Sequence, residues 1–172
     1  MEQNSQIVGW IGTGVMGNSM AGHLIAKGYT LQVYNRTASK ADALVKAGAT
    51  YVDSPQEIAK NADFLFLMLG YPTDVEQMTI DPVHGLIKHM KKGAYLIDHT
   101  TSSPGLAEKI AAEAKNFGVG SIDAPVSGGD IGARNGKLVT MIGGDPADIE
   151  ACTILMNHYS GECKNMGLAG AG

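Results

Sequence analysis

The chain of 172 residues is 44% hydrophobic and carries a formal net charge of −4, with its charges scattered along the sequence. This length and apolar content suit one buried core, and without a basic stripe neither nucleic acid nor an anionic membrane is expected as a main partner. The longest apolar runs are too short to cross a bilayer, and the opening MEQNSQ lacks the blocks of a signal peptide. We therefore expect a cytoplasmic, globular protein.

Short apolar runs alternate with amphipathic segments along the chain, which is the pattern of strands and helices in a parallel sheet. We expect strands at residues 7–11, 30–34, 64–69, 94–98, 118–123 and 137–144. Helices are expected between them at residues 16–27, 39–47, 104–116 and 145–156. The third helix has a start signal, with Ser103 as N-cap and Pro104 at its first position. The predicted fold class is α/β, a Rossmann-type doubly wound, mostly parallel sheet in a single domain over residues 1–164.

A glycine motif follows the first predicted strand and opens the first predicted helix. In this setting GxGxxG is typical of a dinucleotide site, whereas elsewhere it is a glycine-rich turn that binds nothing. Gly12 would allow the tight turn, Gly14 the approach of the pyrophosphate, and Gly17 the close packing of the helix. The predicted cofactor-binding residues of this motif are Gly12, Thr13, Gly14, Val15, Met16 and Gly17.

The end of the second predicted strand bears on the choice between NADP and NAD. An NAD site normally presents an acid there to the ribose 2′-hydroxyl, but Asn35 stands in that place and Arg36, Thr37 and Lys40 follow. A guanidinium and a hydroxyl can bind a 2′-phosphate through charge-assisted hydrogen bonds. The alternative is a solvated turn that contacts no ligand. We predict NADP as the cofactor in preference to NAD.

The segment from residue 121 to 144 contains a second glycine-rich stretch. It is interpreted as a strand ending at Asp123, followed by an extended loop in which Ser127, Gly128 and Gly129 expose backbone amides and a hydroxyl. Such a loop could hold a carboxylate, although a bulged surface loop is an equal alternative.

Two threonines, Thr100 and Thr101, follow the strand expected at 94–98. The carboxyl edge of a parallel sheet is where ligands bind in such folds. By themselves, these threonines could equally be helix caps.

Cys152 and Cys163 are interpreted as reduced thiols, because no export signal precedes them. Together with His158 they would still lack a fourth metal ligand and a recognised spacing. No metal site is therefore predicted.

The motifs together resemble those of the β-hydroxyacid dehydrogenases, a family that includes 3-hydroxyisobutyrate dehydrogenase, tartronate semialdehyde reductase and the glyoxylate and succinic semialdehyde reductases. The resemblance covers essentially the whole chain and is carried by GWIGTGVMGNSMA, IDHTTSSP and DAPVSGGDIGARNGKL. It implies that the substrate carboxylate is held by Ser127, Gly128 and Gly129, and that the cofactor is bordered by Leu69, Gly70 and Thr101. His99 and Gly70 depart from the usual Met or Ser and Pro, and we expect both to affect the rim of the site and its substrate preference.

The resemblance also implies what this chain lacks. The catalytic lysine of the family would follow shortly after Gly172, so residues 165–172 are expected to start a truncated interdomain segment. An assisting asparagine and an all-helical domain, through which the parent protein would form a homo-oligomer, would come next. Lys137 and Lys164 are interpreted as solvated lysines, so no catalytic residue is predicted within the chain.

The sequence thus predicts the cofactor-binding domain of an NADP-dependent oxidoreductase. The reaction would transfer hydride between the nicotinamide and a small 3-hydroxy acid or semialdehyde, and the chain alone would lack the acid–base lysine. The alternative is a non-catalytic NADP-binding or sensing module. The DAPVSGG stretch favours the enzyme, because a sensor has no need of a carboxylate site.

Overall fold

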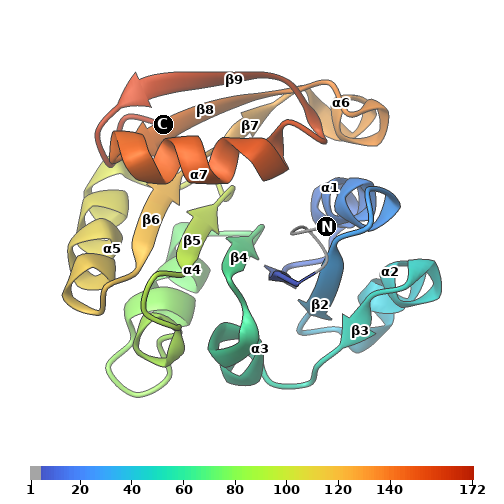
Figure 1. The fold of residues 1–172 in the computed structure, drawn as a ribbon, viewed down its shortest axis with the longest axis horizontal. Helices are drawn as coiled ribbons and strands as arrows, with labels where there is room; N and C mark the ends of the chain where they lie inside the picture. The colour runs from blue at the N-terminus through green and yellow to red at the C-terminus, as the bar shows by residue number, and fades with distance from the viewer. Residues whose placement is uncertain (1–4) are drawn as a thin grey trace.

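A nine-stranded sheet runs through the molecule in the computed structural model, which describes residues 5–172 (Figure 1). Six strands are parallel, in the order β3-β2-β1-β4-β5-β6: β1 (Ile7–Ile11), β2 (Thr30–Tyr34), β3 (Thr50–Tyr51), β4 (Phe64–Leu67), β5 (Tyr95–Asp98) and β6 (Gly120–Asp123). All four residues of β4 are buried, as expected for a parallel strand covered on both faces. The predicted α/β fold with a mostly parallel sheet is therefore confirmed.

The sheet continues beyond β6 with a change of direction. The last strands are β7 (Val126–Ser127), β8 (Leu138–Gly144) and β9 (Ser160–Gly167). Strand β8 is antiparallel to β6 and β7, whereas β9 runs parallel to β8 along its other edge. In Figure 1, β7, β8 and β9 lie together at the top of the molecule.

Helices cover both faces of the sheet, and each face has its own hydrophobic core. One core takes side chains from α1 (Val15–Ala26), α2 (Asp42–Ala47), α6 (Gly129–Asn135) and α7 (Pro146–Met156). The other takes them from α3 (Pro55–Asn61), α4 (Pro72–Ile80) and α5 (Pro104–Asn116). Two short 3₁₀ turns, η2 (Ala38–Ala41) and η3 (Ile87–His89), complete the fold. The chain is doubly wound, as the sequence predicts.

Several predicted elements agree with the structure in detail. The first two strands have the predicted bounds, and Ser103 caps α5 by accepting a hydrogen bond from the Leu106 amide, with Pro104 as the first helical residue. The helix expected at 39–47 is divided, because η2 occupies its start and α2 begins only at Asp42.

The prediction of an extended glycine-rich loop after Asp123 is wrong. The chain forms the short strand β7 and then helix α6, whose Ala133 is buried in the core and accepts a hydrogen bond from His23 of α1. Tertiary contact with α1 thus stabilises a helix that its glycine content disfavours.

Strand β9 runs through the domain boundary expected at residue 164. Only Ser160 of this strand is buried, so the strand lacks the alternating apolar pattern that identifies strands in a sequence. Beyond it, the Gly170 and Gly172 amides donate to Asp123 Oδ1 and Oδ2, each at 2.9 Å. Residues 165–172 are therefore held against the sheet by strand pairing with β8 and by these hydrogen bonds to Asp123.

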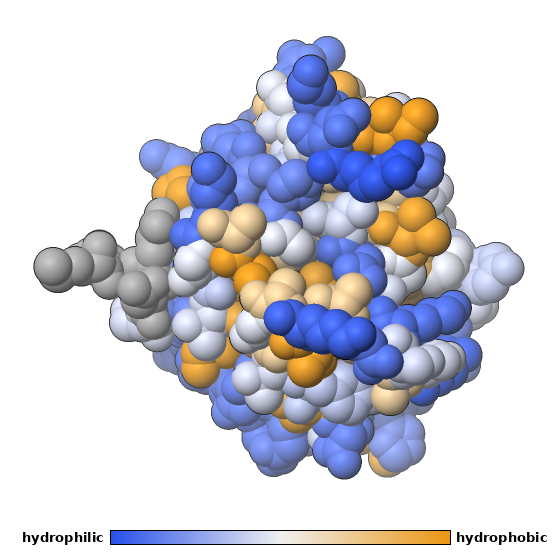
Figure 2. Space-filling model, turned by 90° about the vertical axis from the view of Figure 1, so that its right-hand side faces the viewer, coloured by the Kyte–Doolittle hydropathy of each residue, from blue (hydrophilic) through white to orange (hydrophobic). Residues whose placement is uncertain are grey.

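The surface mixes polar residues with isolated hydrophobic ones. On the face drawn in Figure 2, hydrophobic residues form separate patches between polar ones. The exposed large hydrophobic side chains include Val15, Tyr71, Ile131 and Leu168. Across residues 5–172, no helix combines the length and the apolar character that crossing a bilayer requires.

Candidate cofactor-binding site

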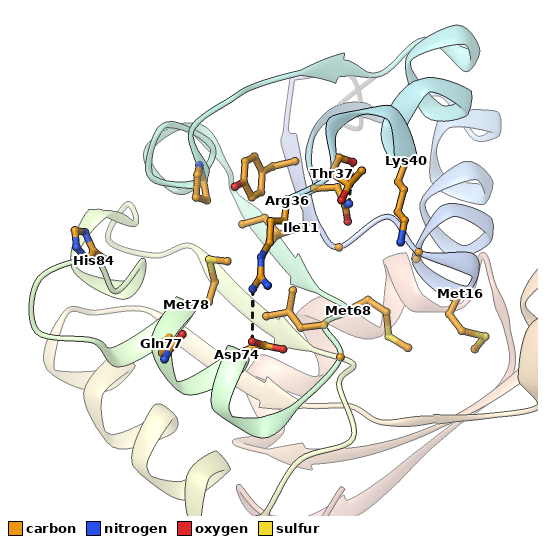
Figure 3. A pocket seen from close by; sticks show the side chains of 18 of the residues that line it. Ile11, Met16, Arg36, Thr37, Lys40, Met68, Asp74, Gln77, Met78 and His84 are labelled. Carbon is orange, nitrogen blue, oxygen red and sulfur yellow. Dashed lines mark hydrogen bonds and ion pairs between the residues drawn. The ribbon is translucent and has the colours of Figure 1, made fainter.

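A cleft of about 910 Å³ lies beyond the carboxyl ends of β1, β2 and β4, where ligands bind in folds of this topology. One wall consists of the β1–α1 turn and the end of β2, and the facing wall comes from the β4–α4 turn and α4 (Figure 3). Most predicted cofactor residues line it: Gly12, Gly14, Val15, Met16, Gly17, Asn35, Arg36, Thr37, Lys40, Leu69 and Gly70. The fold therefore brings three separate sequence segments to one cavity.

The glycines of the β1–α1 turn meet different surroundings. Gly12 has a φ of +99°, and a Cβ there would collide with the carbonyl oxygen of Met68. A Cβ on Gly17 would collide with the Gly12 carbonyl oxygen, whereas a Cβ on Gly14 would meet no atom within 4 Å. The turn is therefore tight at Gly12 and Gly17 and open at Gly14, which is the arrangement that a bound pyrophosphate requires.

Helix α1 begins at this turn with Gly14 as its N-cap, without a side-chain cap and without an acidic residue in its first turn. The Trp10 indole supports the turn, because its Nε1 donates to the Gly12 carbonyl oxygen at 3.0 Å and its ring stacks on Phe66. An uncapped helix start combines free amides with the positive end of the helix dipole, which suits an anion. The local geometry thus fits the phosphates of a dinucleotide.

Asn35 links the two predicted cofactor segments. Its Oδ1 accepts a hydrogen bond from the Thr13 amide at 2.9 Å, and its Nδ2 donates to the Thr37 carbonyl oxygen at 3.0 Å. The Thr13 side chain is buried and is not among the residues that line the cleft. The Asn35 amide therefore holds the β1–α1 turn against the end of β2, a positioning role that the sequence did not indicate.

Three exposed polar side chains follow on the same wall: Arg36, Thr37 and Lys40. Arg36 extends across the cleft, and its Nη2 lies 3.6 Å from Asp74 Oδ1 on α4 (Figure 3). A guanidinium, a hydroxyl and an ammonium group on one wall offer the donors that a phosphate needs.

The end of β4 is fixed by a neighbouring strand. The buried Thr100 accepts a hydrogen bond from the Leu69 amide at 2.8 Å through its Oγ1. Thr101 is exposed in the loop after β5 and is not among the residues that line the cleft. The structure thus places Leu69 and Gly70 in the cleft, while Thr101 lies outside it.

The predicted substrate residues lie apart from this cleft. Ser127 ends β7, and the exposed Gly128 and Gly129, with φ of +131° and +62°, start α6. None of the three is among the residues that line the cleft. The exposed Lys137 and Lys164 also lie outside it, and Lys164 Nζ is 3.6 Å from Glu162 Oε1.

The expectation that His99 belongs to the rim is wrong, because its side chain is only 1% exposed. Near pH 7 the ring is neutral with its proton on Nδ1, which donates to the Ala124 carbonyl oxygen at 2.6 Å, while Tyr159 donates its hydroxyl proton to Nε2 at 2.7 Å. Burial lowers the pKa of His99 to about 4. His99 therefore belongs to the core beside Trp10 and is too deep to meet a substrate.

Asp98 is buried next to His99 in the sequence and faces Asp123 across the β5–β6 ladder. Burial raises the pKa of Asp98 to about 6, although its Oδ1 accepts a hydrogen bond from the Thr100 amide at 2.9 Å. The carboxyl ends of β5 and β6 thus carry two adjacent acidic groups, one of which resists ionisation.

Reasoning from the sequence found Leu69 and Gly70 on the facing wall but missed seven other residues that line the cleft. They lie at the start of α3, on α4 and in the loop after α4: Pro55, Gln56, Asp74, Gln77, Met78, Asp81 and His84. These residues form no motif. The residues of α4 could have been placed here only by knowing that α4 follows β4, the strand beside β1.

The chain is similar to proteins of known family. Residues 7–167 match a family described as the NAD-binding domain of 6-phosphogluconate dehydrogenase. A mitochondrial 3-hydroxyisobutyrate dehydrogenase-like protein of Arabidopsis thaliana is 48% identical over 165 residues, covering 96% of this chain and 49% of the relative. The mitochondrial 3-hydroxyisobutyrate dehydrogenase of Homo sapiens is 36% identical over 166 residues, with the same two coverages. The chain thus spans about half the length of these relatives.

Solved structures agree with this relationship. The 3-hydroxyisobutyrate dehydrogenase of Mycobacterium tuberculosis, solved with L-serine, superposes with a TM-score of 0.91 at 27% identity, covering 97% of this chain and 56% of that one. Psf3 in complex with NADP+ and 2-OPP gives a TM-score of 0.90 at 29% identity, covering 95% and 57%. The chain therefore belongs to the family of the NAD-binding domain of 6-phosphogluconate dehydrogenase, together with relatives named 3-hydroxyisobutyrate dehydrogenase.

Proposed function

We propose that this chain is the cofactor-binding domain of an NADP-dependent oxidoreductase that acts on a small 3-hydroxy acid or semialdehyde. The observation that carries the proposal is the shared cleft, in which the open Gly14 turn and the row of Arg36, Thr37 and Lys40 line one wall. The cofactor would supply the hydride chemistry through its nicotinamide. The protein would supply binding, orientation and shielding from water.

The cleft offers a separate group for each charged part of the cofactor. The amides at the start of α1 would hold the pyrophosphate, since that helix end carries no cap of its own. Arg36, Thr37 and Lys40 would bind the 2′-phosphate. Asn35 would hold these two parts of the wall in register through its hydrogen bonds to Thr13 and Thr37.

Calorimetric titration with NADPH and NADH tests the cofactor assignment. NADPH should bind about 10- to 100-fold more tightly, because the 2′-phosphate gains charge-assisted hydrogen bonds. Arg36→Ala should weaken NADPH binding and leave NADH nearly unchanged. Arg134→Ala is a matched control, since Arg134 is exposed on α6 and does not line the cleft. Equal affinities for the two cofactors in the wild type would contradict the NADP preference.

The chemical step is proposed to need groups that residues 1–172 do not supply. We propose that a small carboxylate substrate is held at Ser127, Gly128 and Gly129, and that the acid–base lysine belongs to the remaining half of the length seen in the relatives. This chain should therefore bind NADPH without reducing small semialdehydes or glyoxylate, while the human relative serves as the full-length comparison. Turnover by this chain would show that one of its own residues transfers the proton.

The assembly and the location of the whole protein are proposed as well. We propose that the parent protein is a homo-oligomer formed through its further helical part, and that it is cytoplasmic as the sequence predicts. The relatives of Arabidopsis thaliana and Homo sapiens are instead named as mitochondrial. Fractionation of cells that produce the whole protein distinguishes the two locations.

A further inference from the structure

The cleft contains an ion pair that joins its two walls. Arg36 reaches from the end of β2, and Asp74 reaches from the first turn of α4, with 3.6 Å between Arg36 Nη2 and Asp74 Oδ1 (Figure 3). The Arg36 side chain is 84% exposed, whereas that of Asp74 is only 28% exposed. The acid is therefore the more confined partner, and the arginine is the one that is free to move.

Asp74 is held in place by its own wall. It lies in the first turn of α4, where the positive end of the helix dipole favours a carboxylate. Its amide donates to the Tyr71 carbonyl oxygen at 3.1 Å. Asp74 therefore lies at a helix start that favours its charge, and it lines the cleft.

The other acid of this wall is engaged differently. Asp81 Oδ1 accepts hydrogen bonds from the Val83 and His84 amides at 2.9 and 2.7 Å, so it stabilises its own loop. Lys40, the second cation of the opposite wall, forms no ion pair within the described residues. Two acids, Asp74 and Asp81, line the cleft. Of these, Asp74 is the one that forms an ion pair with a predicted cofactor-binding cation, Arg36.

We propose that Asp74 is a specificity-determining residue that competes with the 2′-phosphate for the Arg36 guanidinium and thereby weakens the preference for NADP over NAD. This inference rests on the proposed function, because it assigns the 2′-phosphate to Arg36. NAD sites normally present an acid at the end of the second strand, where this chain has Asn35. Asp74 supplies an acid from the facing wall instead. NAD, with its neutral 2′-hydroxyl, can bind while the Arg36–Asp74 ion pair stays in place.

The expected size of the effect follows from the exposure of the pair. Exposed ion pairs are weak and screened by salt, so releasing Arg36 should change affinity by about 2- to 5-fold at an ionic strength of about 0.15 M. Asp74→Asn keeps the shape of the side chain and removes its charge. It should tighten NADPH binding by about 2- to 5-fold and leave NADH binding nearly unchanged.

The test is a calorimetric titration of NADPH and NADH on Asp74→Asn, Arg36→Ala and the double variant. Glu76→Gln is the matched control, because it removes the same charge from an exposed position of the same helix that does not line the cleft. Thermal unfolding checks that each variant is folded, and Asp74→Ser provides a second variant without the charge. In the Arg36→Ala background, the change at position 74 should no longer tighten NADPH binding.

The outcomes separate this inference from the function on which it rests. If Arg36→Ala weakens NADPH binding but Asp74→Asn leaves the NADPH-to-NADH ratio unchanged or lowers it, the inference is wrong and the proposed function stands. An equal shift in Glu76→Gln, or a gain that persists in full without Arg36, would also overturn competition for Arg36. If Arg36→Ala changes neither affinity, the assignment of the 2′-phosphate fails and the inference fails with it.

Discussion

Two glycine-rich regions of this molecule look alike in sequence and differ in what surrounds them. In the β1–α1 turn, a Cβ at Gly14 would meet nothing within 4 Å. The second region consists of Gly143, Asp123 and residues 167–172, and we call it the tail junction. Here the space beside Gly143 is filled by other atoms of the chain. A Cβ on Gly143 would lie 2.7 Å from the Leu168 carbonyl oxygen and 2.8 Å from both Asp123 Oδ2 and the Gly172 amide.

A glycine can thus make room either for a ligand or for another part of the backbone. At the tail junction, the Asp123 carboxylate accepts hydrogen bonds from the Gly170 and Gly172 amides. These two amides are therefore already engaged within the chain. At the start of α1, no side chain caps the helix. Because an uncapped helix start suits an anion, the first region is expected to bind a phosphate, whereas the second holds the chain end against the sheet.

The largest expected effect concerns the open glycine. Gly14→Val should abolish measurable cofactor binding, a loss of at least about 100-fold, because the branched side chain would fill the space needed by the pyrophosphate. Its backbone φ of −67° is available to any residue, so the fold should remain intact. Calorimetry and circular dichroism measure the two effects. A folded variant with undiminished NADPH affinity would show that the pyrophosphate binds elsewhere.

The second prediction uses two adjacent buried ionisable groups, Asp98 and His99. The pKa of His99 is lowered to about 4, so between pH 4 and 6.5 the unfolded chain binds a proton that the folded chain excludes. This group makes the fold more stable as the pH rises, by about 3 kcal/mol across that window.

Asp98 has the opposite effect. Its pKa is raised to about 6, so between pH 4 and 6 the folded chain keeps a proton that the unfolded chain loses. That group makes the fold less stable as the pH rises, by about 3 kcal/mol.

The two effects should nearly cancel in the wild type and separate in variants. In Asp98→Asn, the free energy of unfolding should rise by about 3 kcal/mol more between pH 4 and 6.5 than it does in the wild type. Urea unfolding at several pH values measures this slope. A variant with the same pH dependence as the wild type would contradict the assignment of a buried, neutral carboxyl to Asp98.

A smaller effect is expected at the filled glycine. Gly143→Ala should destabilise the fold by about 2 kcal/mol, because the added carbon must displace backbone and carboxylate atoms. Cofactor affinity should stay unchanged, since Gly143 does not line the cleft. Thermal unfolding with and without NADPH gives both quantities. If Gly143→Ala weakened NADPH binding without destabilising the fold, the tail junction would bind the cofactor instead of packing the chain.

The sequence predicted those features that depend on local chemistry. The GxGxxG turn follows β1 and the Ser103 cap starts α5, because each is set by a few adjacent residues. Asn35, Arg36, Thr37 and Lys40 line the cleft for the same reason, since they follow a strand at the carboxyl edge of the sheet.

Features that depend on tertiary contact were missed. Helix α6 is rich in glycine and is held by α1, and β9 has mostly exposed side chains and is held by backbone pairing with β8. His99 follows a strand at the same edge as the cleft, yet hydrogen bonds to Ala124 and Tyr159 keep it in the core. Asp74 belongs to no motif and reaches Arg36 only because α4 packs opposite the end of β2.

A crystal structure of this chain with NADP+ would locate each part of the cofactor. The pyrophosphate should lie on the amides at the start of α1 beside Gly14. The 2′-phosphate should lie within hydrogen-bond distance of Arg36, with the Arg36–Asp74 pair opened. A cofactor bound outside the cleft, or a 2′-phosphate turned away from Arg36, Thr37 and Lys40, would contradict the proposed cofactor site.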